Sequence, residues 1–170
     1  MSPRPPKHPR PLPHLLVSAA TLLAACTPVS FPLNITDLSA RPDPVVGKTV
    51  TLDIEIRSSQ DEDEVILEIQ PPDGVRLIEG DLTWHGSLAA NEPLKHSVSL
   101  CVLYPGDWRI YIGAYSLENG DTKYADADTI HFISEQGTGQ AVPGREYTIT
   151  QDTPAPVPSP TSPPPAPCSE

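Results

Sequence analysis

Apolar and polar residues alternate in the middle of the chain, and this alternation constrains the fold more than any other feature. It runs through residues 50–56, 65–69, 98–102 and 108–114. A two-residue period places every second side chain on one buried face of a β-strand. No stretch shows apolar residues at helical spacing over the roughly 10–12 residues that a helix needs. We therefore expect an all-β domain.

Turn-forming residues divide these stretches into short strands. They occur in Pro42-Asp43-Pro44, Pro71-Pro72-Asp73-Gly74, Asn91-Glu92-Pro93, Pro105-Gly106 and Asn119-Gly120. The pattern predicts about seven strands, at residues 34–41, 48–58, 63–70, 75–79, 94–103, 107–117 and 122–133, with a short eighth segment at 82–86. Strands of this number and length favour an antiparallel immunoglobulin-like β-sandwich. A small barrel is the alternative.

The dipeptide Asn119-Gly120 is a strong signal for a two-residue hairpin turn. With that turn, Ile130 and Phe132 would fall on the face opposite the apolar residues of the preceding strand. We therefore expect a change of parity, either a three-residue loop at 119–121 or a β-bulge between Ala125 and Asp128. Either change would turn Ile130 and Phe132 inward.

The first 25 residues have the organisation of an export signal. Arg4, Lys7 and Arg10 form a basic start with no acidic residue, and residues 15–25 are predominantly apolar. This apolar segment is shorter than the roughly 20 residues that span a bilayer as a helix. Residues 1–25 are therefore predicted to be a signal peptide rather than a membrane helix.

The end of this signal, Leu23-Ala24-Ala25-Cys26, resembles the bacterial lipobox at all four positions. The resemblance implies cleavage between Ala25 and Cys26 and a diacylglycerol thioether on Cys26 Sγ, often with an acyl group on the new amine. Two or more acyl chains hold a protein stably at a membrane. We therefore expect attachment to the cell membrane or outer membrane, with the domain on the extracytoplasmic side. Cleavage after Ala25 without lipidation is the alternative.

The chain divides into five segments. After the signal, residues 26–33 form a tether, residues 34–134 the sandwich and residues 135–150 an extension of uncertain structure. Residues 151–170 are rich in proline and predict a polyproline-like or disordered tail.

Charge and cysteine content limit the partners and the covalent structure. The net charge is −11, and it becomes about −14 once the three basic residues of the signal are removed, so a nucleic-acid partner is not expected. Cys101 lies at an outward position of a predicted strand, and Cys168 lies in the tail. Export permits disulfides. We expect free thiols or an intermolecular bridge rather than a Cys101–Cys168 bridge.

Three runs in the domain resemble bacterial immunoglobulin-like domains of the CARDB and NEW3 type. They are residues 82–88, with a tryptophan before a Gly-x-Leu turn, residues 91–98, and residues 105–110, where Pro-Gly opens a strand. The resemblance implies an accessory or binding module of exported proteins. It supplies no catalytic residues.

We find no sequence motif for catalysis or for a bound metal or cofactor. His85, His96 and His131 are expected at the surface or rim. The acidic run Asp61-Glu62-Asp63-Glu64, and the residues Asp121, Asp126 and Asp128, are considered as calcium ligands. Because no Asp-x-Asp-x-Asp-Gly loop is present, these acidic residues are expected to be solvated, and no metal site is predicted.

Tyrosines suggest the one candidate binding surface. If Trp108 and Ile110 face inward, then Tyr111 and Tyr115 face outward with Tyr124 nearby. Such rings stack on sugars or grip proteins, although cross-strand tyrosines also stabilise sheets without any ligand. The sequence therefore favours a non-catalytic structural or protein-interaction module with an envelope protein or glycan as its partner. The alternative is a module that binds glycan or peptide through these tyrosines or a free strand edge, and an enzyme is not expected.

Overall fold

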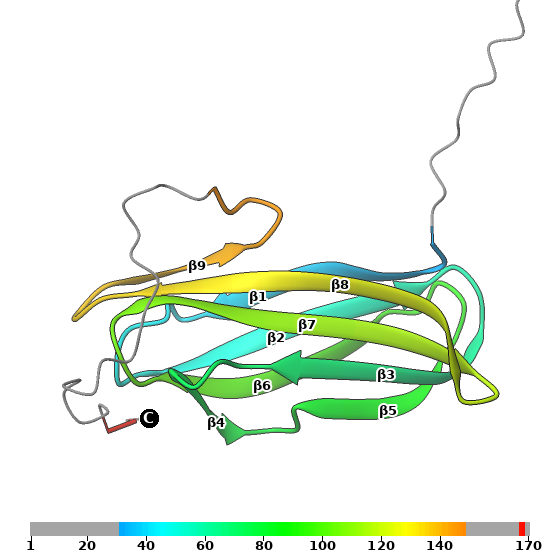
Figure 1. Ribbon diagram of the computed structural model, residues 1–170, viewed down its shortest axis with the longest axis horizontal. Coiled ribbons are helices and arrows are strands. Elements are labelled where there is room, and N and C mark those ends of the chain that lie inside the picture. The colour runs from blue at the N-terminus through cyan, green and yellow to red at the C-terminus, as the bar shows by residue number, and fades with distance from the viewer. Residues whose placement is uncertain (1–30, 149–166, 169–170) are drawn as a thin grey trace, which may run out of the picture.

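The computed structural model describes residues 31–148 and 167–168 (Figure 1). In this part of the chain there are nine strands and no helix, and therefore no helix that is long and apolar enough to cross a membrane. The strands are β1 (Leu33–Arg41), β2 (Thr49–Ser58), β3 (Glu62–Gln70), β4 (Val75–Glu79), β5 (Thr83–Leu88), β6 (Leu94–Val102), β7 (Gly106–Glu118), β8 (Asp121–Ser134) and β9 (Gly139–Pro143). The predicted signal, Cys26 and most of the proline-rich tail lie outside the described residues.

The strands form an immunoglobulin-like sandwich of two antiparallel sheets. One sheet has the order β1-β2-β6-β4, and the other has the order β5-β3-β7-β8-β9. The predicted all-β class is therefore confirmed, and the sandwich replaces the alternative of a barrel. The seven predicted strands and the short eighth segment are all present. A ninth strand, β9, lies in the segment 135–150 and pairs with the end of β8.

The alternating apolar residues meet between the two sheets as one core. Leu52 and Ile56 from β2 and Ile110 and Phe132 from the other sheet are fully buried. Trp108 closes one end of this core, and its indole Nε1 donates a hydrogen bond of 2.8 Å to the backbone oxygen of Tyr104. Burial of each large apolar side chain contributes about 1.5–3 kcal/mol, which makes this core the main source of stability.

The β7–β8 hairpin changes parity, but not at either of the places that we predicted. Its turn has two residues, since Glu118 pairs with Asp121, and Asn119 and Gly120 both have positive φ, at 56° and 85°. The register then shifts between Ser116 and Leu117, which leaves Lys123 of β8 as the extra residue of a bulge. The predicted three-residue loop and the predicted bulge at 125–128 are both wrong.

The consequence that we predicted from the parity change is nevertheless correct. Beyond the bulge, Ile110 pairs with Ile130 and Trp108 pairs with Phe132, so both residues of β8 face the core. Lys123 can serve as the extra residue because it is exposed at the end of the hairpin, where its side chain reaches solvent.

The expectation for the cysteines is wrong, because Cys101 and Cys168 form a disulfide with a Cα–Cα distance of 6.0 Å. Cys101 alternates with the inward residue Leu100 on β6, as predicted from the pattern, yet it is fully buried. Sequence spacing could not reveal this pair, because Cys168 lies 67 residues further along the chain. The bridge fastens Cys168 to the sheet that contains β1, β2, β4 and β6.

Candidate binding surface

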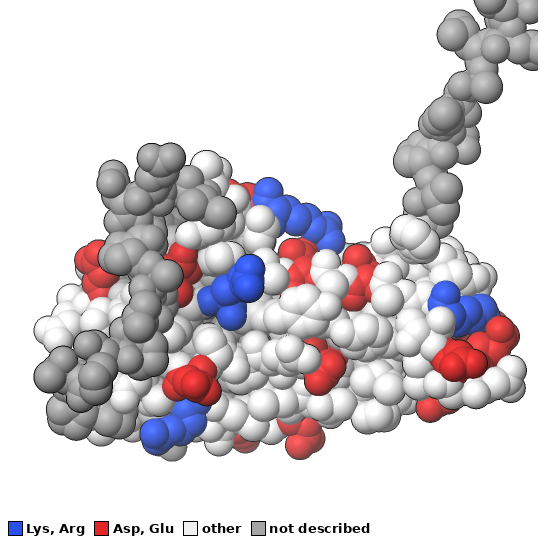
Figure 2. Space-filling model, viewed as in Figure 1, with Lys and Arg blue, Asp and Glu red and all other residues white. Residues whose placement is uncertain are grey.

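Tyr111 and Tyr115 lie on the outer face of the five-stranded sheet, as the sequence predicts. They alternate along β7 with the buried residues Ile110, Ile112 and Ala114, and both rings are partly exposed. β7 is a central strand, paired with β3 on one side and β8 on the other. Figure 2 shows this side of the molecule, with charged residues scattered over it and a large uncharged area between them.

Gly113 allows the two tyrosines to interact. A Cβ atom at this position would overlap the ring of Tyr115, so the ring lies against the backbone of Gly113. Interaction with the Tyr111 hydroxyl raises the pKa of Tyr115 above its usual value of 10.0, and partial burial and the negative charge of Glu68 add to the effect. The two rings therefore form a preorganised pair along one strand.

Tyr124 does not belong to this pair. It lies across from the buried residue Ser116 and packs against the edge of the core, on the opposite face of the sheet from Tyr115. The bulge at Lys123 is the physical reason, because one extra residue reverses the direction of every side chain that follows it. The predicted three-tyrosine surface is therefore reduced to Tyr111 and Tyr115.

A hollow of about 290 Å³ opens beside Tyr111, at the place where β9 ends next to β8. It is lined by Tyr111, Ala127, Asp128, Thr129, Gly144 and Arg145. Gly144 is required at its rim, because a Cβ there would overlap Thr129, and the Gly144 backbone N–H donates a hydrogen bond of 2.6 Å to the Thr129 oxygen. This hollow adds polar groups to the aromatic surface.

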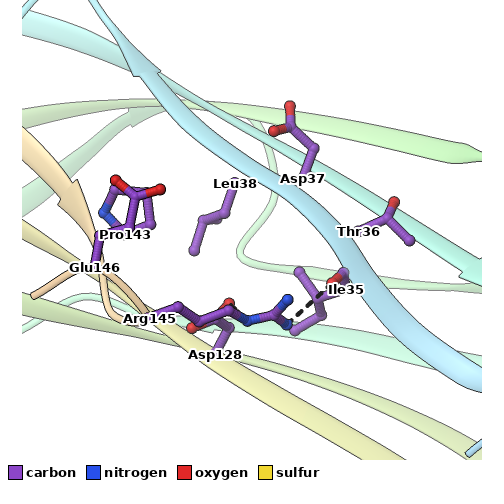
Figure 3. A pocket seen from close by; sticks show the side chains of 8 residues that line it. All are labelled: Ile35, Thr36, Asp37, Leu38, Asp128, Pro143, Arg145 and Glu146. Carbon is purple, nitrogen blue, oxygen red and sulfur yellow. Dashed lines mark hydrogen bonds and ion pairs between the residues drawn. The ribbon is translucent and has the colours of Figure 1, made fainter. Parts of the chain in front are cut away.

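Arg145 lines both this hollow and a second one of about 180 Å³, which Figure 3 shows. Its Nε lies 2.9 Å from an Asp128 oxygen, and its Nη2 donates to the backbone oxygen of Ile35 at 3.2 Å. Asp126 accepts the backbone N–H of the same Ile35 at 2.7 Å. These contacts join β1 to β8 across the edge of the sandwich, at the bulge in β1 between Ile35 and Asp37.

Four of the seven acidic residues considered as calcium ligands, Asp61, Glu62, Asp126 and Asp128, have protein partners. Glu62 is buried and accepts hydrogen bonds from Ser116 Oγ at 2.5 Å and from Gln60 Nε2 at 2.8 Å. Asp61 accepts the backbone N–H of Ala90 at 2.8 Å. Within residues 31–148 and 167–168, no three metal-ligating side chains converge. The burial of Glu62 corrects the expectation that every acidic residue of this turn is solvated.

His131 is buried, which corrects the prediction of a surface or rim position. Its ring stacks on Tyr147, with centroids 3.6 Å apart, and its Nδ1 lies 2.9 Å from an Asp107 oxygen. The Tyr147 hydroxyl donates to the other oxygen of Asp107. Of the other two histidines, His85 is exposed, and His96 Nε2 lies 2.8 Å from the Asp81 backbone oxygen.

Sequence reasoning missed Arg145, Asp107 and Tyr147, each of which holds the segment after β9 in place. The sequence feature that could have drawn attention to Arg145 is that it is the sole basic residue in 135–150. Asp107 and Tyr147 carry no local signal, because their contact brings together residues 40 positions apart.

The arrangement offers aromatic faces, one ion pair and hydroxyl groups around a shallow hollow. Such groups can stack on a ligand and form hydrogen bonds with it.

Comparison with known proteins gives distant similarities only. No family model and no curated protein matches the sequence. A FixG-related protein from Vibrio parahaemolyticus is 16% identical, with a TM-score of 0.42 over 62% of this chain and 99% of that one. The cupredoxin domain of amoB from Nitrosocaldus yellowstonii is 9% identical, with a TM-score of 0.42 over 78% and 98%. WR4, an MSP family member from C. elegans, is 10% identical, with a TM-score of 0.34 over 53% and 92%.

Proposed function

We propose that this chain is an exported, lipid-anchored envelope protein whose sandwich acts as a non-catalytic structural or protein-interaction module. The sequence Leu23-Ala24-Ala25-Cys26 carries the proposal, because it matches the lipobox at every position. Lipid on Cys26 would hold the protein at the cell membrane or outer membrane, with the domain on the extracytoplasmic side. No nucleic-acid partner is proposed, since the mature chain is strongly acidic.

The disulfide between Cys101 and Cys168 supports an extracytoplasmic location. Disulfides form and persist in oxidising compartments, whereas cytoplasmic thiols are kept reduced. The CARDB and NEW3 resemblance supports the role of an accessory module, because such domains occur in exported proteins without supplying catalytic groups.

Fatty-acid labelling tests the anchor directly. Cells that express the full chain are fed a clickable fatty acid, and the label on the protein is compared between wild type and Cys26→Ser. We expect the wild type to be labelled and Cys26→Ser to lose the label. Cys101→Ser/Cys168→Ser is the matched control and should keep it. Equal label in wild type and Cys26→Ser would reject lipidation at Cys26.

A second candidate function is the binding of a glycan or peptide. The specific observation that favours it is the position of Tyr111, which belongs both to the exposed tyrosine pair and to the wall of the hollow. Aromatic rings beside a few convergent polar groups are typical of sites for small ligands. This function is compatible with the first, because an anchored module can hold a glycan or a protein of the envelope.

A further inference from the structure

The hollow beside Tyr111 has the features of a sugar subsite. Its lining includes Tyr111, Thr129, which pairs directly with Tyr111 across the two strands, and the ion-paired residues Arg145 and Asp128. Its volume, about 290 Å³, lies just below the roughly 300–1,000 Å³ of small-ligand sites. An apolar ring face next to polar groups suits a ligand with one C–H face and hydroxyl edges, which is the character of a pyranose.

The charges around the hollow favour a neutral ligand. Arg145 is the one cation of the lining, and it already lies 2.9 Å from the Asp128 carboxylate. The whole chain carries a net charge of −11, so a polyanionic glycan would be repelled over a longer range. A neutral sugar can accept hydrogen bonds from the guanidinium and donate hydrogen bonds to the carboxylate without breaking the pair.

The tyrosine pair is preorganised for stacking. Tyr111 lies on a central strand, and the Tyr115 ring covers Gly113, which lies between the two tyrosines on that strand. Because the Tyr115 ring lies against Gly113, it adds a second aromatic surface next to the first. Side chains fixed before binding lose less conformational entropy when a ligand arrives.

A peptide that adds a strand fits this place poorly. β7 is paired on both sides. At the neighbouring edge of β8, the Thr129 N–H donates to the Asp128 side chain at 2.8 Å, and its oxygen accepts the Gly144 N–H. Both backbone groups of Thr129 are therefore engaged, and strand addition requires free ones.

We propose that this hollow is a binding site for a neutral glycan, in which one pyranose ring stacks on Tyr111 and contacts the Arg145–Asp128 pair while the next ring reaches Tyr115. The proposal rests on the second candidate function and names its ligand class. It is independent of lipidation at Cys26.

Binding is tested on the full chain. The protein is purified in a detergent that has no sugar headgroup, because such a headgroup would compete for the site. The probes are three neutral oligosaccharides, namely tetramers of β-1,4-linked N-acetylglucosamine, of β-1,4-linked glucose and of α-1,4-linked glucose. A synthetic peptide of sequence 153–167 represents a peptide ligand. Binding is followed by calorimetry and by saturation-transfer difference NMR.

We expect saturable binding of at least one oligosaccharide, which Tyr111→Ala weakens about tenfold or more, the loss that corresponds to about 1.4 kcal/mol. Tyr111→Phe keeps the ring and should bind within about threefold of wild type. Arg145→Gln should weaken binding, whereas Arg57→Gln should not. Arg57 is the matched control, since it is also half-exposed and ion-paired, with Glu55 at 2.8 Å, on the other sheet.

Three outcomes would overturn the glycan site. These are no binding of any of the three oligosaccharides, equal binding by wild type and Tyr111→Ala, and binding of the peptide alone. None of them changes the fatty-acid labelling of Cys26, so failure of the glycan site and failure of the anchor are read separately. Circular dichroism of each variant establishes that it is folded.

Discussion

The carboxylate of Glu62 is held at the start of β3 by side chains from its own segment and from two other strands. It accepts hydrogen bonds from Ser116 of β7 and from Gln60, and Lys123 of β8 lies 3.8 Å away. Only 2% of the Glu62 side chain is exposed, so solvent cannot replace these partners. Burial without them would cost several kcal/mol, which explains why an acidic residue is tolerated here.

We predict that Glu62→Ala lowers the free energy of unfolding by about 2–3 kcal/mol, because it leaves the Ser116 hydroxyl and the Gln60 amide unpaired. Glu62→Gln keeps one acceptor oxygen and should cost less. Urea unfolding followed by tryptophan fluorescence measures both. Glu64→Ala, at an exposed position of the same acidic run, is the control. An equal loss for Glu62→Ala and Glu64→Ala would contradict the interpretation.

At the scale of single residues, the sequence predicted the direction of side chains better than their partners. The two-residue period correctly placed Tyr111 outward, because direction along a strand depends only on local geometry. Glu62 and His131 were assigned wrongly because their surroundings come from Ser116 and Tyr147, which lie far away in the chain.

β9 is the strand held least by the core, and its attachment depends on the segment that follows it. Its five residues pair only with the end of β8. Tyr147 stacks on His131 and donates to Asp107, and these contacts fasten the segment to β7 and β8. The hydrogen bond to Asp107 raises the pKa of Tyr147 above its usual value of 10.0, because the carboxylate stabilises the protonated phenol.

We predict that Tyr147→Phe, which keeps the stacked ring but loses the hydrogen bond, speeds amide hydrogen exchange in β9 and leaves exchange in β2 unchanged. A group whose pKa is raised on folding stabilises the fold fully below its unfolded pKa and loses that effect as pH rises through the raised value. The Tm difference between wild type and Tyr147→Phe should therefore be constant below pH 10.0 and shrink above it. Tyr124→Phe is the control. Unchanged exchange in β9 would contradict this role.

At the scale of elements, the existence of strands could be predicted and their irregularities could not. Apolar alternation marks β2, β3, β6 and β7, whereas β9 reads Gly-Gln-Ala-Val-Pro and gives no such signal. The parity of the β7–β8 hairpin showed that an extra residue was needed, because Ile130 and Phe132 had to face inward. Its position at Lys123 stayed hidden, since any exposed polar residue can occupy a bulge.

For the whole molecule, the disulfide determines how the last part of the chain is held. It joins residues separated by 67 positions, and this loop contains β7, β8 and β9. In the chain-entropy account, cross-linking a loop of this length stabilises the fold by about 4 kcal/mol, because the unfolded chain has fewer conformations.

We predict that Cys101→Ser/Cys168→Ser lowers the free energy of unfolding by about 2–4 kcal/mol. Thermal melting of wild type with and without reductant should show a matching decrease in Tm, whereas the double variant should not respond to reductant. Ser99→Ala, at an outward position of the same strand, is the control. Equal melting of wild type and double variant, with no effect of reductant, would show that the bridge does not stabilise the domain.

The disulfide also decides how the molecule would respond to mechanical tension. Leu33 pairs with Ser58 at one end of β2, and Cys101 pairs with Thr49 at the other end. A pull on the two termini would therefore reach opposite ends of β1, β2 and β6 in a single sheet, and β7, β8 and β9 would be bypassed. The hydrogen bonds between β1, β2 and β6 would then be sheared together rather than broken one after another.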